Sequence, residues 1–153
     1  MGQNAIELLK ADHDRVRELL GKLIHTTARA VKSRTDLLEK IESEVKIHTR
    51  LEEEIFYPAF RDSDGKDHDE MFFEAKEEHR AVEALVLPDL KQTQPDSESF
   101  SGRAKVLKEL IEHHAQEEEE EMFPEAQKSL SSDQLAELGE RMSQRKKELQ
   151  KGG

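Results

Sequence analysis

HTRLEEEIFYP, residues 48–58, is the stretch that decides the fold, because a close copy of it returns later in the chain as HAQEEEEEMFP, residues 114–124. Each copy has a histidine, a glutamate four residues on, and a proline six residues after the glutamate. The offset from His48 to His114, the repeat offset, also separates His13 from His79. The chain therefore reads as two similar halves, each with a lone histidine followed 35 residues later by a histidine–glutamate pair.

Apolar residues recur at alternating steps of three and four in four segments around this repeat. The segments cover residues 6–27, 38–59, 72–86 and 104–122. This spacing is typical of one face of an α-helix that packs in a bundle. The repeated histidines and glutamates lie on the same faces, and no segment alternates as a β-strand does. We expect an all-α fold, an antiparallel up-down-up-down four-helix bundle.

Polar residues and prolines mark the expected helix ends. Ser33 is the expected N-cap of the second helix, and residues 61–66 and 92–99 predict a turn and a longer loop. Three prolines near the C-terminal ends of helices are expected to kink or stop them, because proline lacks an N–H donor. They are Pro58, Pro88 and Pro124.

The C-terminal segment, residues 131–153, predicts a fifth, amphipathic helix that packs on the bundle formed by residues 1–130. Ser132 is its expected N-cap. Its apolar face consists of Leu135, Leu138, Met142 and Leu149. Such a helix would serve as a lid, a brace or a dimer surface, and we expect a monomer or a weak homodimer.

Simple counting predicts that the histidines share one layer of the bundle. Two residues at one level lie equidistant from the turn that joins their helices. The midpoint of His13 and His48 is near residue 30 or 31, that of His48 and His79 near 63 or 64, and that of His79 and His114 near 96 or 97. All three fall on or beside an expected turn. The glutamate of each repeat copy then lies one helical turn further along the same face.

The composition argues against several kinds of partner. The chain has 153 residues and a net charge of −11, and its one basic cluster, residues 145–147, is short. Nucleic acid and anionic membrane surfaces are poor partners, because binding them requires clustered Lys and Arg. Cysteine is absent, which removes disulfides and thiolate ligands. No apolar run of about 18 residues and no hydrophobic signal core occur, so we expect a cytoplasmic protein.

Polar groups on buried helix faces need partners, because an unpaired buried charge costs several kcal/mol. Nitrogen and oxygen ligands without sulfur suit iron, manganese or zinc. The pattern of a lone histidine followed by His-x3-Glu, given twice, resembles the hemerythrin-like (HHE cation-binding) domain over roughly residues 5–128. The resemblance implies two iron ions in an oxo- or hydroxo-bridged di-iron centre, with both glutamates bridging. The implied ligands are His13, His48, Glu52, His79, His114 and Glu118.

The sequence departs from the oxygen-carrying hemerythrins in two ways. The carriers have a fifth histidine one turn from the third-helix histidine, whereas Ala75 and Glu83 stand four residues before and after His79. They also place an aspartate, one residue further on, where this chain has its second repeated glutamate. The resemblance therefore implies a more symmetric site with one open position on each metal. His113 is a further candidate for the missing ligand, but it lies off the apolar face.

Three classes of function fit such a centre. The first is a redox enzyme or stress protein that acts on hydrogen peroxide, O2 or nitric oxide, and peroxide decomposition is favoured because both metals are open. The second is O2 storage or sensing without turnover. The third is iron storage or trafficking. A small molecule is the expected partner in the first two classes, and the ligands alone do not establish that the protein is an enzyme.

Other polar residues of the pattern have less specific interpretations. His25 and His68 are interpreted as surface or hydrogen-bonded residues that bind no metal. Tyr57 lies opposite His48 on the helical wheel, which argues against a role for it at the metals. Several acidic residues of the second copy are expected on a solvated face: Glu117, Glu119 and Glu120.

The immediate surroundings of the metals are also predicted from the pattern. Arg17 and Glu83, which are related by the repeat offset, are either outer partners of the histidines or a surface pair. Four side chains are expected to form an apolar wall around the metals: Val16, Phe56, Val82 and Met122.

Overall fold

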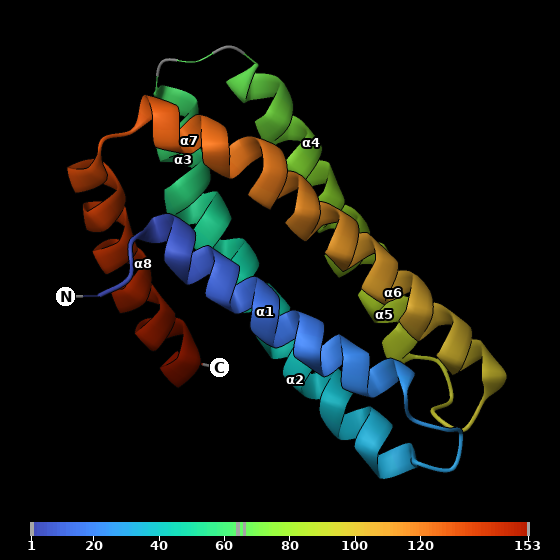
Figure 1. Ribbon diagram of the computed structural model, residues 1–153. Coiled ribbons are helices and arrows are strands. Elements are labelled where there is room, and N and C mark those ends of the chain that lie inside the picture. Colours follow the sequence, from blue (N-terminus) through green and yellow to red (C-terminus); the bar gives the residue numbers. More distant parts are fainter. Residues whose placement is uncertain (1, 64, 66, 153) are drawn as a thin grey trace.

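The computed structural model describes residues 2–63, 65 and 67–152, and it consists of four antiparallel helical columns with a fifth helix beside one end (Figure 1). The first column is α1 (Ala5–Ile24), and the second is α2 (Val31–Leu51), η1 (Glu52–Phe56) and α3 (Tyr57–Asp62). The third column is α4 (His68–Arg80), η2 (Ala81–Val86) and α5 (Leu87–Lys91). The fourth is α6 (Glu98–Glu117), η3 (Glu118–Met122) and α7 (Phe123–Ser129), and the fifth helix is α8 (Ser132–Gly152). The predicted all-α bundle is confirmed, and the described residues contain no strand.

Three columns contain a π-helical turn, and each of these turns is followed closely by a proline. Pro58, Pro88 and Pro124 lie inside continuous columns, so of the two expected effects, a kink or a stop, the stop is wrong. In η1, the Tyr57 N–H donates to the Glu52 carbonyl five residues back. A π-helical turn is wider than an α-helical turn, so it leaves room for a proline ring that would otherwise clash with the preceding turn.

Two predicted helix caps differ from the structure. α2 begins at Val31, before Ser33, and its N-terminus has no side-chain cap. α8 is capped by Ser131 rather than Ser132, since the Ser131 hydroxyl accepts from the Gln134 N–H at 3.1 Å and the Gln134 side chain accepts in return. The turn predicted at 61–66 overlaps the end of α3, and residues 64 and 66 lie outside the described residues.

Arg34 fixes the end of the bundle that lies away from α8. Its side chain is buried, with a relative exposure of 2%. It donates to the carbonyls of Thr26 and Pro95 at 3.1 and 2.6 Å and to the hydroxyl of Ser101 at 2.8 Å. Its guanidinium also lies 4.9 Å from the centre of the Phe100 ring. These contacts join the α1–α2 turn to the α5–α6 loop and compensate the buried charge.

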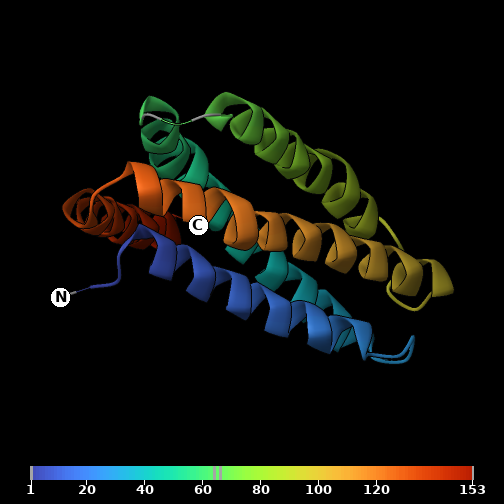
Figure 2. The ribbon, with the colours of Figure 1, turned by 45° about the horizontal axis from the view of Figure 1, so that its top comes forward.

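The bundle core consists of two apolar clusters separated by a polar layer. The cluster nearer α8 includes Leu9, Leu51, Phe56, Phe60, Phe123, Leu135, Leu138 and Met142. The other includes Val16, Leu20, Ile41, Val82, Phe100 and Leu107. α8 packs against α1, α2 and η1 at the end where α1 begins, as Figures 1 and 2 show. No helix in the described ranges is long and apolar enough to cross a membrane.

Close packing of α8 depends on a glycine. A Cβ atom at Gly139 would lie 2.3 Å from the Gln3 carbonyl oxygen and 2.8 Å from backbone atoms of Asn4. The absence of a side chain therefore lets α8 approach the chain just before α1. The predicted apolar face is buried at Leu135, Leu138 and Met142, while Leu149 is partly buried against the same cluster.

Candidate metal centre

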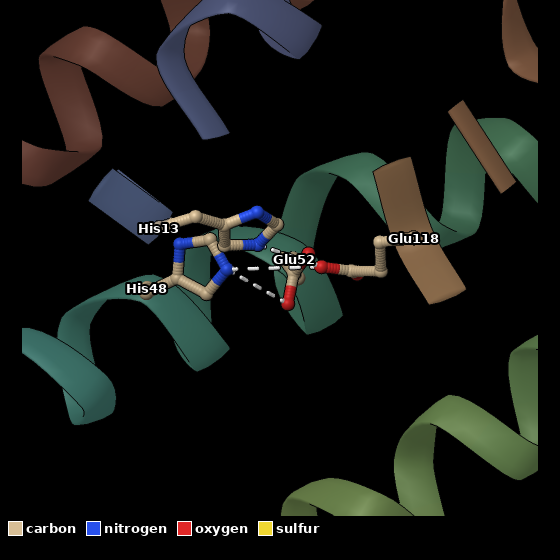
Figure 3. A group of neighbouring side chains, drawn as sticks. All are labelled: His13, His48, Glu52 and Glu118. Atoms are coloured by element: carbon tan, nitrogen blue, oxygen red, sulfur yellow. Dashed lines mark hydrogen bonds and ion pairs between the residues drawn. The ribbon is translucent and has the colours of Figure 1, made fainter. Parts of the chain in front are cut away.

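The six side chains predicted from the repeat meet in the polar layer between the two apolar clusters. They are His13, His48, Glu52, His79, His114 and Glu118. All six are buried, and the most exposed of them, His48, retains 9% of its accessible surface. Figure 3 shows four of them converging from three columns, with His13 from α1, His48 and Glu52 from the second column, and Glu118 from η3.

The Nε2 atoms of the histidines point at the two glutamates. His13 Nε2 lies 3.0 Å from Glu118 Oε1, and His79 Nε2 lies 3.0 Å from Glu52 Oε1. His48 Nε2 is 3.2 Å from Glu52 Oε1. His114 Nε2 is 3.5 Å from Glu118 Oε1. Two groups of donor atoms result, each with all atoms within 4.8 Å of one another, and Glu52 belongs to both.

Several buried nitrogen and oxygen atoms in this layer lack a full set of hydrogen-bond partners. His48 Nε2 and Glu52 Oε2 are fully buried and make no hydrogen bond. The Nε2 atoms of His79 and His114 face each other at 3.1 Å, where two neutral imidazoles can share at most one hydrogen bond. Buried polar atoms are rarely left unpaired. Cations placed among these nitrogen and oxygen atoms would satisfy them, so the residues present fit a pair of metal ions.

The second ring nitrogen of every histidine in the layer contacts a carboxylate from a neighbouring column. The Nδ1–oxygen pairs are His13–Glu119 at 2.7 Å, His48–Asp12 at 3.0 Å, His79–Glu53 at 2.7 Å and His114–Glu78 at 2.7 Å. Such carboxylates orient metal-binding imidazoles and make them better donors. When Nδ1 holds the proton, the Nε2 lone pair is left facing the centre of the layer.

Sequence reasoning missed these four carboxylates, and the expectation that Glu119 is merely solvated is wrong. A signal was present, because the repeat offset relates Asp12 to Glu78 and Glu53 to Glu119. Each also stands next to a predicted ligand. Adjacent residues point about 100° apart on a helix. A neighbour of an inward-facing histidine or glutamate is therefore directed toward the adjacent column rather than the centre.

The carboxylates and histidines change one another's pKa. Burial opposes protonation of the histidines, but contacts with carboxylates outweigh it and raise the pKa of all four. Hydrogen bonds from His13 and Arg17 lower the pKa of Glu119 to about 2. Burial and the carboxylate of Glu78 raise the pKa of Glu117 to about 7. The metal-free layer is therefore a dense set of paired charges.

Arg17 and Glu83 are not paired with each other. Arg17 Nη1 lies 3.0 Å from Glu119 Oε2, so this arginine contacts a histidine partner, as one of the two interpretations expected. Glu83 is partly buried beside His79, and burial raises its pKa. The two positions therefore have different environments, although the repeat relates them.

Tyr57 reaches the layer, so the helical-wheel argument against it is wrong. The π-helical turn η1 inserts extra backbone between Glu52 and Tyr57, which rotates Tyr57 toward the layer. The Tyr57 hydroxyl donates to Glu118 Oε2 at 2.7 Å and lies 3.2 Å from Glu52 Oε1. Its ring stacks on His79 at a centroid distance of 5.5 Å. Burial and the two glutamates raise its pKa well above 10.0, so the hydroxyl keeps its proton.

A cavity of about 40 Å³ lies on the side of the layer opposite Tyr57, large enough for a molecule of the size of water. The four histidines form its floor. Its walls come from residues that the repeat pairs: Val16 with Val82, Val45 with Ile111, and Thr49 with Ala115. The predicted wall residues Val16 and Val82 lie here, whereas Phe56 and Met122 belong to the cluster on the other side.

The other three histidines lie outside the layer. His25 is exposed and contacts the Gly21 carbonyl. His68 is buried, stacks on Phe60 and has Nδ1 2.9 Å from the Phe60 carbonyl. His113 is 61% exposed and contacts Glu117 at 2.9 Å. None of the three joins the two groups of donor atoms described above.

Comparison with known families agrees with this geometry. Residues 4–126 match the hemerythrin HHE cation-binding domain. The chain belongs to this family. Membership establishes a metal-binding domain, and the buried histidines and glutamates of the layer form two groups of atoms that could hold a cation.

Relatives of this HHE domain have been found among solved and curated proteins. A crystal structure of an HHE cation-binding domain-containing protein of Mycobacterium kansasii, a homolog of Rv2633c, has a TM-score of 0.85 and 28% identity, over 99% of this chain and 90% of that one. The uncharacterized protein Rv2633c of Mycobacterium tuberculosis is 29% identical, over 95% of this chain and 87% of that protein. A DNA nickase of Nostoc sp. is 24% identical over 96% of this chain, which spans 40% of the nickase.

Proposed function

We propose that this protein is a non-haem di-iron protein that decomposes hydrogen peroxide. The proposal rests on one observation: four imidazole nitrogens and two carboxylates converge directly beneath a small apolar cavity. Two positions follow from the donor groups. His13 and His48 would hold the first metal position, and His79 and His114 the second. Glu52 would supply a carboxylate oxygen to both positions, and Glu118, which joins the first group and lies 3.5 Å from His114 Nε2, would complete the set.

The donor set supports iron but does not select it alone. Imidazole and carboxylate ligands also suit manganese and zinc, and the family resemblance is what favours iron. When bound, two irons supply a reversible store of two electrons beside an open coordination position. Disproportionation requires such a store, because one H2O2 loses two electrons and two protons to become O2, and a second gains them to become two waters.

The residues of the chain admit a small molecule, exclude bulk water and hold a proton near the layer. The cavity walls are mostly aliphatic, so they admit a small neutral molecule and keep the floor of imidazoles out of contact with bulk water. On the opposite side, Tyr57 Oη holds a proton 2.7 Å from Glu118 Oε2 and fixes that carboxylate. Peroxide decomposition would need both a protected site and a nearby proton, since the peroxide that is reduced must take up two protons to become water.

The missing fifth histidine favours turnover over O2 carriage. Ala75 occupies one of the two neighbouring positions on the third column, is buried, and offers no ligand atom. Glu83, at the other, joins neither group of converging donor atoms. Both metals therefore keep an open position in the proposal. We propose no nucleic-acid partner, despite the nickase relative, because the net charge of −11 opposes binding to phosphates.

The test is to load the protein with iron, count the iron per chain, and follow H2O2 with an O2 electrode. We expect two irons per chain and one O2 released for every two H2O2 consumed. His25→Ala is the matched control, because this exposed histidine lies outside the layer. A protein that binds two irons but releases no O2 from peroxide would overturn the proposal. A long-lived O2 complex would then indicate storage or sensing, and ready iron release would indicate iron storage or trafficking.

A further inference from the structure

The carboxylates behind the first metal position are neutralised by cations. Asp12, which accepts from His48 Nδ1, is 1% exposed. Lys146 of α8 places its Nζ 2.6 Å from Asp12 Oδ1, and Arg15 contacts the same carboxylate oxygen. A single buried carboxylate thus faces two permanent cations as well as the imidazole. Lys146 has no equivalent in the repeat, since α8 follows the second copy.

The second carboxylate of the first metal position also has a cation. Glu119 Oε2 lies 2.7 Å from His13 Nδ1 and 3.0 Å from Arg17 Nη1. Arg17 divides its charge with Glu112 of α6, which lies 3.0 Å away and is half exposed. Both carboxylates behind the first metal position therefore face at least one permanent cation.

The second metal position lacks these cations. No lysine or arginine in the described part of the chain lies within 4.0 Å of Glu53 or Glu78. The closest cationic candidate is His113, which is exposed and 3.7 Å from Glu78. The repeat explains the difference: the positions equivalent to Arg15 and Arg17 are Ala81 and Glu83. One half of the site has two arginines where the other has a methyl group and a further carboxylate.

This difference bears on metal affinity. A carboxylate on Nδ1–H makes the imidazole a better donor, and loss of such a partner typically costs about 10–100-fold in metal affinity. A cation on that carboxylate withdraws part of the same negative charge, and in a buried layer the attraction is weakly screened. The donor atoms of the two positions are alike, yet their surroundings favour a cation to different degrees.

Given the proposed two-metal site, we propose that its positions are inequivalent. The second metal position, with His79 and His114, binds a divalent cation more tightly and fills first. Lys146 of α8 is a positioning residue that weakens the first metal position through Asp12 and His48. The fifth helix therefore does more than brace the bundle, because it sets the order in which the two ions bind.

Anaerobic titration of the metal-free protein with Co²⁺ tests this, followed by visible absorption and calorimetry at alkaline pH, where protons compete least with the metal. We expect two binding steps that differ in affinity by about tenfold. His114→Ala should remove the tight step and His48→Ala the weak one. Lys146→Met should strengthen the weak step so that the two steps merge, and Lys146→Arg should keep them apart.

Arg145→Met provides the matched control. Arg145 is the neighbour of Lys146 on α8, and it joins α8 to Glu54 at 2.9 Å without contacting Asp12. It should leave both steps unchanged, and thermal unfolding of each metal-free variant shows whether the fold persists. Equal effects of Lys146→Met and Arg145→Met would reduce the role of Lys146 to docking and overturn the inference.

Two further results would also overturn it: two equal Co²⁺ sites in the unmodified protein, or loss of the tight step in His48→Ala. The proposed function fails on different evidence. If Co²⁺ does not reach two ions per chain, the two-metal site itself is wrong. If two equal ions bind and the iron-loaded protein still decomposes peroxide, only the inequivalence is wrong.

Discussion

The two faces of the ligand layer differ in symmetry. The cavity face is built from residues that the repeat pairs, and the pairs are chemically similar: Val16 with Val82, and Val45 with Ile111. On the opposite face, Tyr57 stacks on His79, whereas its repeat partner Phe123 stacks on His13. Both rings pack alike, but only one has a hydroxyl. The repeat thus sets the converging nitrogen and oxygen atoms and the cavity, and departures from it give the two halves of the layer different surroundings.

α8 adds a second difference between the two halves of the layer. It packs against α1, α2 and η1, and its Lys146 reaches Asp12 on one half of the site. In the proposed two-metal site, entry of a small molecule would be shared by both positions, while protons and charge would be supplied unequally.

The largest expected effect comes from removing one of the histidines whose Nε2 atoms converge in the layer between the two faces. His48→Ala or His114→Ala should bind fewer than two irons and lose at least 100-fold in peroxide decomposition. Metal at about 100 times its Kd stabilises a protein by about 2.7 kcal/mol, so metal-dependent stabilisation should fall by roughly 5–10 °C in Tm. Iron analysis and differential scanning calorimetry measure both.

His25→Ala should change neither quantity. His68→Gln should lower Tm, because its ring is buried against Phe60, yet leave the iron content intact. Loss of iron in His68→Gln to the same extent as in His48→Ala would show that the repeat selected the wrong histidines.

The helices and the four histidines of the layer could be predicted from the sequence. Alternating apolar steps predicted the helices. The midpoint rule predicted one layer for His13, His48, His79 and His114, because every α-helical residue advances by the same distance along the helix axis. Both arguments need only local geometry and chain length. The structure brings these four side chains together, as the counting predicts.

The contacts that Tyr57 and Lys146 make with the layer could not be predicted by such counting, for different reasons. The wheel assumes an unbroken α-helix, and η1 breaks it just before Tyr57. The prolines after each π-helical turn were visible, but they were interpreted as kinks or stops near helix ends and not as signs of a π-helical turn. Lys146 belongs to a helix outside the repeat, so its contact with Asp12 depends on how α8 docks, which apolar spacing alone does not determine.

The second prediction concerns a substitution at Ala75, which lies near the second metal position on the side of the layer opposite the main cavity. Ala75 borders a cavity of about 30 Å³ that Glu118 and Met122 also line. Ala75→His should place an imidazole one turn from His79, occupy the open position of that metal, and lower peroxide turnover about tenfold or more. Overpacking would cost about 1–3 kcal/mol of stability.

Stopped-flow spectroscopy of the reduced, iron-loaded Ala75→His variant mixed with O2 should show a longer-lived complex than the unmodified protein forms. Ala75→Leu is the size control, since it fills the same space without a ligand atom. If Ala75→Leu and Ala75→His slow peroxide turnover equally and neither stabilises an O2 complex, space rather than coordination controls the reaction.

The third prediction moves the hydroxyl of Tyr57 to its repeat partner, Phe123. Tyr57→Phe keeps the ring on His79 but removes the donor to Glu118, so we expect two irons to bind and to dissociate about tenfold faster. Phe123→Tyr adds a hydroxyl to the equivalent position beside His13. Iron release to a chelator, with the double variant as a third sample, measures both effects.

Two outcomes of that exchange would be informative. A double variant that releases iron as slowly as the unmodified protein would show that the hydroxyl is needed but that either half can supply it. Unchanged iron release in Tyr57→Phe would contradict a role of this hydroxyl in holding Glu118.

The smallest expected effect is a difference in pH dependence between the metal-free and metal-loaded proteins. Contacts with carboxylates raise the folded-state pKa of His13, His48, His79 and His114 above 6.5. A raised pKa contributes stability that is fully present below 6.5 and is lost as pH rises through the higher folded value.

The metal-free protein should therefore lose a few °C in Tm as pH rises above 6.5. Metal binding requires neutral imidazoles, so the extra stability conferred by Zn²⁺, a redox-inactive probe, should increase over the same range. Parallel thermal scans with and without Zn²⁺ measure the two slopes. A metal-free protein that gains stability with rising pH would mean that burial lowers the pKa of these histidines, so that the folded protein binds fewer protons than the unfolded chain.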